Sequence, residues 1–211
     1  MLSILLILGV LIFLGVLSNA FTILALSGMI IVVGYKFKDL YKKAYIFYSI
    51  AFVITILGTI FYEEYYSRII QGGLLGYSFI LVVMFVGVLP NKSILSRHIK
   101  RNRGSFSILG FIFISSHAFL HLFTPFGGVN LFGLAAFVIM VPLTIISFRI
   151  IRREIAPKDW FTIQKAAYAV YILLFIHLFM VSNTENRVVY AVLGALYINN
   201  RVLKELRKWV Y

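Results

Sequence analysis

The chain has 211 residues, of which 62% are hydrophobic and 13% are charged. A soluble domain is about half apolar and a quarter charged, so this composition excludes an ordinary soluble enzyme and predicts an all-α polytopic membrane protein. The absence of cysteine excludes disulfides, thiolate catalysis and cysteine-held metal centres. The net charge of +13 does not indicate nucleic-acid binding, because the basic residues lie in short segments between apolar runs, as in membrane proteins.

In chain order, the apolar runs predict about eight transmembrane helices embedded in membrane lipid. The uncharged stretch at residues 2–35 is too long for one helix across a hydrocarbon core of about 30 Å. We divide it at Ser18-Asn19, and one long tilted helix is the alternative. Gln71-Gly72-Gly73 and Pro90 bound later spans. The predicted spans are residues 2–17, 20–35, 44–62, 74–90, 105–123, 130–148, 161–181 and 188–200.

The segments between these spans alternate in charge. The basic ones are residues 36–43, 92–103, 149–158 and the C-terminal tail from Arg201. The segments on the other side are short and neutral or acidic. The positive-inside rule therefore predicts a multi-pass protein of the plasma or inner cell membrane, with the basic segments and both termini in the cytoplasm.

Ionisable residues inside membrane spans are functional candidates by default. Deep within the predicted spans, these are His117 and His121 in one span and His177 in another. At 1.5 Å per residue from the preceding basic segments, His117 lies about 17 Å into the membrane and the other two about 22 Å, in its outer half. Because His117 and His121 share a helix face, depth does not choose between them.

Two membrane helices with imidazoles at matched depth suggest a cofactor bound between them. We interpret His177 and one of the pair His117/His121 as axial ligands of at least one b-type haem. Ligation by two imidazoles leaves no open position on the iron and favours electron transfer over oxygen activation. The alternative is a set of packing histidines satisfied by neighbouring backbone or hydroxyl groups.

The stretch RGSFSILGFIFISSH, residues 103–117, resembles the third helix of the ferric-reductase-like transmembrane family. The similarity is closest to the MsrQ type, the haem-binding membrane subunit of bacterial methionine-sulfoxide reductase systems, and the family is related to the NADPH oxidase transmembrane core. In that family a basic residue at the membrane edge, here Arg103, precedes a haem histidine by about fourteen positions, which favours His117. Pro142 to His177 and VGVLPNKS at 86–93 extend the resemblance over roughly residues 44–200.

The resemblance implies a six-helix haem-binding core, residues 36–211, preceded by an additional pair of spans, residues 1–35. It implies one well-ligated haem on the outer side, with His117 and His177 as ligands. The family's inner histidine falls at Gln164, thirteen positions before His177. A second haem on the cytoplasmic side would therefore lack an ordinary ligand.

These features together predict a transmembrane electron-transfer subunit. Its donor is a quinol or a flavin reduced in the cytosol, and its acceptor outside is a partner redox protein, ferric iron or a flavin. The chain has no Gly-rich dinucleotide fingerprint and no flavin domain, so hydride transfer is expected to belong to another polypeptide. Arg68 and Arg187 are the cationic candidates for pairing with propionates of an outer haem.

Two other functions are weighed against electron transfer. A small permease would need polar residues on several helices at mid-membrane depth, and Ser115, Ser116 and Asn130 are a thin set. A haem-free scaffold or assembly subunit would use its histidines only for packing.

Overall fold

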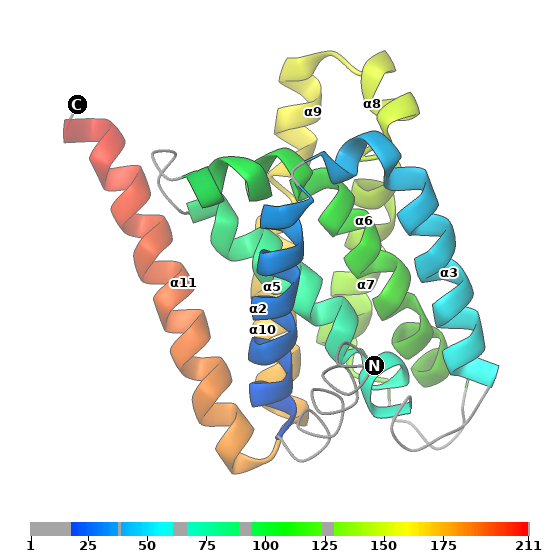
Figure 1. The fold of residues 1–211 in the computed structure, drawn as a ribbon. Helices are drawn as coiled ribbons and strands as arrows, with labels where there is room; N and C mark the ends of the chain where they lie inside the picture. The colour runs from blue at the N-terminus through cyan, green and yellow to red at the C-terminus, as the bar shows by residue number, and fades with distance from the viewer. Residues whose placement is uncertain (1–17, 38, 61–66, 89–93, 124–128, 211) are drawn as a thin grey trace.

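The protein folds as a bundle of helices in the computed structural model, which describes residues 18–37, 39–60, 67–88, 94–123 and 129–210. No strand occurs in these ranges. The predicted first span, residues 2–17, lies outside the described residues. The helices are α2 (Asn19–Lys36), the 3-10 helix η1 (Leu40–Lys43), α3 (Ala44–Ile60), the π-helix η2 (Ser67–Gln71), α5 (Leu74–Val88), α6 (Ile94–Phe123), α7 (Leu131–Ile145), α8 (Arg149–Glu154), α9 (Pro157–Gln164), α10 (Ala167–Val181) and α11 (Thr184–Val210) (Figure 1).

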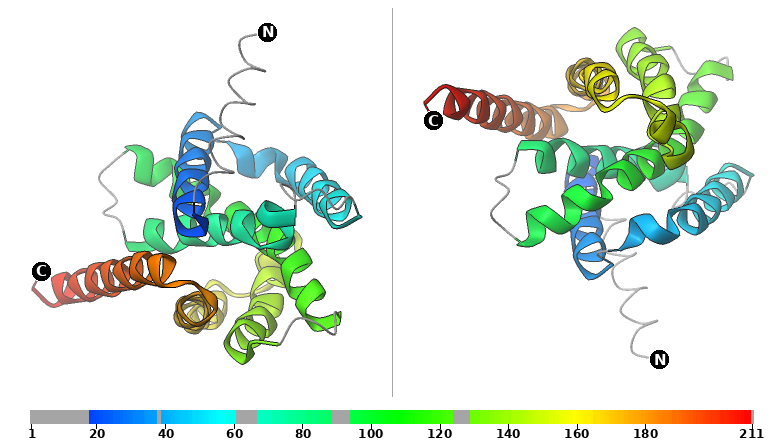
Figure 2. Two further views of the ribbon diagram at one scale, coloured as in Figure 1. Left: turned by 90° about the horizontal axis from the view of Figure 1, so that it is seen from below. Right: turned by 90° about the horizontal axis from the view of Figure 1, so that it is seen from above.

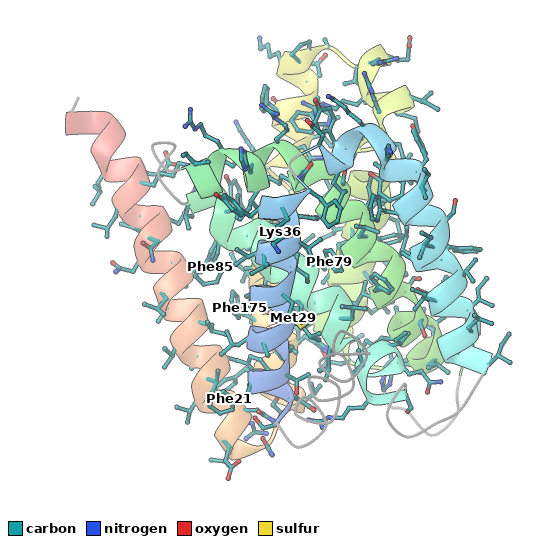
Figure 3. The ribbon with its side chains drawn as sticks, in the orientation of Figure 1. Phe21, Met29, Lys36, Phe79, Phe85 and Phe175 are labelled. Carbon is teal, nitrogen blue, oxygen red and sulfur yellow. The ribbon has the colours of Figure 1, made fainter. Side chains whose placement is uncertain are left out.

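The described helices have the length and the surface of a membrane protein. Four helical segments are long and apolar enough to cross a bilayer: Asn19–Lys36, Leu40–Ile60, Ser96–Phe123 and Pro157–Val181. Helices α5 and α7 are apolar but shorter. Large apolar side chains face outward, such as Phe21 and Met29 on α2, which are 52% and 46% exposed (Figure 3). An all-helical membrane protein is thus supported, while the count of eight spans stays a prediction.

Helices α5 and α6 form the centre of the bundle. Helices α2 and α3 pack on one side of this pair, and α7 and α10 pack on the other (Figure 2). Helix α11 leans away from the bundle toward its C-terminal end in every view (Figures 1 and 2). Its Tyr197 ring contacts Phe85 on α5 and Phe175 on α10, at centroid distances of 5.8 and 6.4 Å (Figure 3).

The central pair approaches most closely where two glycines face each other. A Cβ atom at Gly76 of α5 would lie 2.6 Å from the backbone nitrogen of Ile114 and 2.9 Å from the carbonyl oxygen of Gly110 on α6. A Cβ atom at Gly110 would in turn lie 3.1 Å from Cβ of Phe79. Small residues allow such close backbone packing between membrane helices. This contact fixes α6, and with it His117 one turn beyond Ile114, against α5.

The described basic segments gather at one end of the bundle, which we call the basic end. It comprises η1, the first turns of α6, helix α8 with the start of α9, and the C-terminal half of α11 (Figure 1). The start of α2, η2 and the junction of α10 with α11 lie at the opposite end. This arrangement follows the charge alternation of the sequence, and the positive-inside rule predicts that the basic end faces the cytoplasm.

Several helix boundaries differ from the predicted spans. Helix α6 begins at Ile94, so most of the predicted basic loop at 92–103 is helical. No glycine or proline lies between Ile94 and Arg103, and long polar side chains are good helix formers. The last predicted span, 188–200, is part of the 27-residue helix α11.

The predicted helix at 161–181 is interrupted where α9 ends and α10 begins. The backbone N–H groups of Lys165 and Ala166 donate to carbonyls three residues back, at 3.2 and 3.0 Å. Such 3-10 bonds tighten a helix end and locally change its direction.

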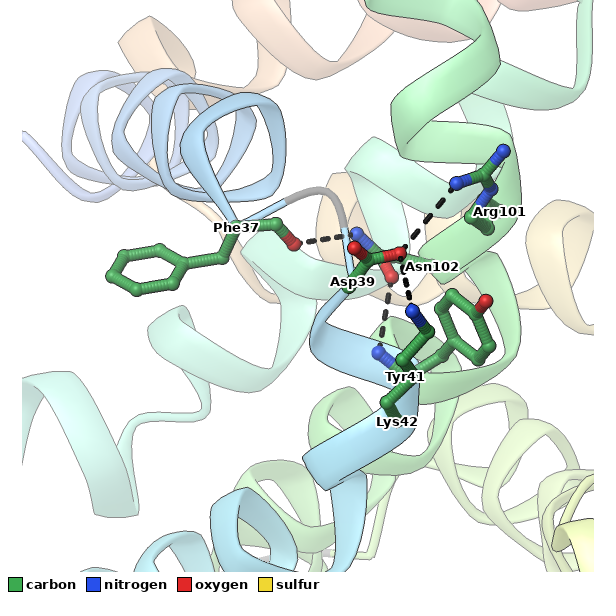
Figure 4. A network of polar contacts seen from close by, with 6 residues as sticks. All are labelled: Phe37, Asp39, Tyr41, Lys42, Arg101 and Asn102. Carbon is green, nitrogen blue, oxygen red and sulfur yellow. Dashed lines mark hydrogen bonds and ion pairs between the residues drawn. The ribbon is translucent and has the colours of Figure 1, made fainter.

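The connection from α2 to η1 is held by a buried side chain of α6. Asn102 is fully buried, its Nδ2 donates to the carbonyl oxygen of Phe37 at 3.1 Å, and its Oδ1 accepts from the N–H of Tyr41 at 3.2 Å (Figure 4). Asp39 lies beside it and pairs with Arg101 at 3.6 Å, with both side chains partly exposed. Asn102 therefore satisfies two backbone groups that the helix ends leave open.

We expect Asn102→Ala to destabilise the protein by about 1–3 kcal/mol, because the fully buried Asn102 side chain makes two hydrogen bonds to the backbone that alanine cannot replace. The loss is measured as a lower midpoint of thermal unfolding in a fixed detergent. The control is Asp39→Asn, which removes only exposed ion pairs and should change stability by less than about 1 kcal/mol. Equal losses in both variants would contradict this role of Asn102.

Candidate functional site

The structure brings the three predicted intramembrane histidines together. The ring centroids of His117 and His121 on α6 lie 4.5 Å apart, and those of His117 and His177 lie 6.1 Å apart across α6 and α10. Both helices end within two turns of these residues, at the end opposite the basic end (Figure 1). Residues 60 positions apart in the sequence thus form one cluster of imidazoles.

The ring of His117 is oriented by the backbone of η2. Its Nδ1–H donates to the carbonyl oxygen of Gln71 at 2.9 Å. Gly73 follows with φ of 73°, and a Cβ atom there would lie 3.1 Å from Cγ of His117. The bond at Nδ1 leaves Nε2 with its lone pair, and metal-ligating histidines commonly use their second ring nitrogen in this way. The predicted break at Gln71-Gly72-Gly73 is confirmed, and it has a role in orienting the site.

His177 differs from His117 in its hydrogen bonding. It is half-buried, and its buried Nδ1 has no hydrogen-bond partner among the described residues. Gly133 of α7 lies against it, since a Cβ atom there would be 2.8 Å from Nδ1. A buried polar atom without a partner needs an explanation. Because Nδ1 is packed against Gly133, the ring nitrogen open to a ligand is Nε2.

Two cavities flank His117 and His177. One cavity, of about 150 Å³, lies toward α7. His121 also lines it, and its wall is mainly apolar, with Phe137 and Met140. The other, of about 330 Å³, lies toward α2, α5 and α11 and is more polar. Because both histidines line both cavities, space extends to either side of the pair.

Two of these histidines have the ligand chemistry that a haem requires. Haem iron takes two axial ligands, and neutral imidazole nitrogens from facing helices are a common pair. Within the described ranges, no group of three or more His, Cys, Asp or Glu side chains is arranged to hold a metal ion alone. Axial ligation of a haem needs only two such side chains, and His117 and His177, which line both cavities, could supply them.

Arg103 and Gln164 do not join the histidines. They line a separate cavity of about 440 Å³ near the basic end, which shares only Met140 with the smaller histidine cavity. The side-chain amide of Gln164 donates to Oγ of Ser147 at 3.2 Å. The inner ligand position that the resemblance implies, Gln164, therefore lies in a cavity separate from the three histidines.

The two predicted cations for propionates lie at the end opposite the basic end. The Nε–H of Arg68 donates to Oδ1 of Asn19 at 3.0 Å, and Asn19 lines the more polar histidine cavity. The guanidinium of Arg187 donates to the carbonyl oxygen of Met180 at 3.4 Å and lies 5.9 Å from the ring of Phe179. Arg68 is thus linked to the cavity wall through Asn19.

Sequence reasoning missed two parts of this site, the carbonyl of Gln71 and the backbone at Gly133. Gln71 is visible in the sequence as a helix break, but its contact with His117 spans 46 positions. Gly133 has no side chain that could mark it as a site residue in the sequence. Its role is visible only in the structure, where its backbone lies against His177. Comparison of the chain with protein-family models, curated proteins and solved structures finds no match.

Proposed function

We propose that the protein is the transmembrane electron-transfer subunit of an oxidoreductase system, with a b-type haem between α6 and α10 held by His117 and His177. One observation carries the proposal: an imidazole oriented by a backbone carbonyl and an imidazole with an unpartnered buried nitrogen lie 6.1 Å apart in one site. When bound, a haem supplies one-electron oxidation and reduction of its iron.

The surrounding residues have supporting roles. Gln71 holds the His117 ring in one tautomer, so that Nε2 is the ligating nitrogen. The apolar wall with Phe137 and Met140 excludes water, and such a shell influences the reduction potential of a bound cofactor. His121 is exposed and contacts the edge of His117, so it covers the site from the side of α6.

The position of the site supports electron delivery at the end opposite the basic end. His121 and His177 lie within a few residues of the ends of α6 and α10 there. We assign the acceptor, a partner redox protein, ferric iron or a flavin, to that side. The donor, a quinol or a flavin reduced in the cytosol, is assigned to the basic end, where the positive-inside rule predicts the cytoplasm. This division matches the ferric-reductase-like family that the sequence resembles.

A haem-free scaffold is less well supported. It gives no ligand to the three clustered imidazoles and the two cavities that flank them. A permease is also less well supported, because the histidine cavity toward α7 has only the three imidazoles and Asn130 as polar lining.

The electron-transfer function is tested with the haem-loaded protein in liposomes that contain trapped ferricyanide. Reduced flavin is added outside, or a quinol is added to the membrane, and bleaching of ferricyanide is followed. We expect bleaching well above the rate in protein-free liposomes, and its loss in His177→Ala. Equal rates in the presence and absence of the protein would refute electron transfer with these donors.

The comparison of His117→Ala with His121→Ala distinguishes the two candidate ligands on α6. We expect His117→Ala to lose most of the haem, because only His117 is oriented by a backbone carbonyl. His121→Ala should keep most of it. The measurement is haem absorbance per mole of purified protein, and a larger loss in His121→Ala would reverse the assignment.

A further inference from the structure

The cavity at the basic end has a chemistry different from that of the histidine site. Its volume is about 440 Å³, and residues of α5, α6, α7, α8, α9, α10 and α11 line it. Its charged lining residues are all cationic: Lys100, Arg101, Arg103, Arg152 and Lys204. Among the described lining residues none is acidic.

Some of these cations already contact protein groups. Lys204 of α11 donates to the carbonyl oxygen of Gly87, and Arg101 pairs with Asp39. The guanidinium of Arg152 lies 4.2 Å from the centre of the Trp160 ring. The cavity therefore keeps a strong excess of positive charge, with Arg152 and Trp160 stacked in its wall.

Trp160 provides a second, independent indication of a ligand. Its indole Nε1–H is buried and has no acceptor among the described residues. Indole nitrogen is a donor only, so the group that would satisfy it must be an acceptor. A hydrogen-bond donor without a partner in a cationic cavity points to an oxyanion.

The deeper wall of the same cavity is apolar. Ile80 and Val83 of α5, Met140 and Leu143 of α7, and Val170 of α10 line it. A small hydrophilic anion would make no apolar contact with this wall. A ligand with an anionic head and a hydrocarbon body would match both parts.

We propose that this cavity binds the phosphate head of an anionic phospholipid. The phosphate contacts Arg152, Arg103 and the Nε1–H of Trp160, and hydrocarbon of the lipid contacts the apolar wall. Basic pockets between membrane helices on the cytoplasmic side are a recurring type of lipid site. The inference does not depend on haem, and it gives a role to the cavity that Gln164 lines in place of a histidine.

The test is native mass spectrometry of the delipidated full-length protein titrated with phosphatidylglycerol, phosphatidylcholine or inorganic phosphate. We expect one phosphatidylglycerol to bind about tenfold more tightly than phosphatidylcholine, as a charge-assisted contact would give. Inorganic phosphate alone should bind far more weakly. Equal binding of both lipids, or binding of inorganic phosphate as tight as that of phosphatidylglycerol, would overturn the proposal.

Two adjacent arginines supply a matched control. Arg152 and Arg153 are both exposed residues of α8, but only Arg152 lines the cavity. Arg152→Gln should weaken phosphatidylglycerol binding by about tenfold, while Arg153→Gln should change it by less than about twofold. Trp160→Phe keeps an aromatic ring but removes the donor, and it should weaken binding without affecting haem content. Equal effects of Arg152→Gln and Arg153→Gln would show that the site lies elsewhere.

Discussion

His177→Ala is expected to abolish haem retention. In the proposed site His177 is the ligand contributed by α10, and its ring centroid lies 6.1 Å from that of His117. Alanine would leave the proposed haem with His117 as its one histidine ligand, so the cofactor would be held mainly by packing against the apolar cavity wall. The measurement is the reduced-minus-oxidised absorbance of the purified variant per mole of protein, expected at less than about a tenth of the wild-type value, which corresponds to about 1.4 kcal/mol or more of binding free energy.

Gln164→Ala is the matched control, because Gln164 lies near the other end of the predicted span that contains His177. Gln164 falls at the inner-histidine position of the family that the sequence resembles, but it lines the separate cavity at the basic end and donates a hydrogen bond to Ser147. We expect nearly full haem content in this variant. A similar loss in both variants would show that the site is misplaced or that the variants share a general folding defect.

The second large effect is expected at the crossing of α5 and α6. In Gly76→Ala the new methyl group would lie 2.6 Å from the backbone nitrogen of Ile114, so one helix must shift relative to the other. Overpacking of this kind costs about 1–3 kcal/mol. The shift also moves Ile114 and His117, so we expect lower thermal stability together with partial loss of haem.

A glycine-to-alanine substitution at a position without such a contact separates the effect of overpacking from that of helix propensity. Gly28 lies within α2, and a Cβ atom there would meet no other atom within 4 Å. Gly28→Ala should raise stability slightly, by up to about 1 kcal/mol, since alanine is the better helix former. If Gly76→Ala unfolds at the same temperature as Gly28→Ala, the helices are not packed as described.

Much of the helical architecture follows from the sequence. The span predicted at 44–62 corresponds to α3, which ends at Ile60, and the break at Gln71-Gly72-Gly73 separates η2 from α5. Charge alternation predicted which segments share an end of the bundle. The sequence does not predict the helical start of α6, because a cluster of basic residues between apolar runs is typical of a loop, although those residues are also compatible with a helix.

The candidate site was predictable only in part. Hydropathy identified His117, His121 and His177, because an imidazole in an apolar run is conspicuous. Spacing within one helix cannot choose between residues four positions apart, since they share a face. The structure distinguishes them through a third element, the carbonyl of Gln71, and through the glycine at position 133. Both depend on contacts between distant segments, which local sequence patterns do not specify.

The visible absorption spectrum of the purified protein, expressed with ample haem and recorded before and after dithionite, tests the central claim most directly. Ligation by His117 and His177 predicts a low-spin b-type spectrum with sharp bands on reduction, since both axial positions are filled. A colourless, fully folded protein under the same conditions would contradict the account.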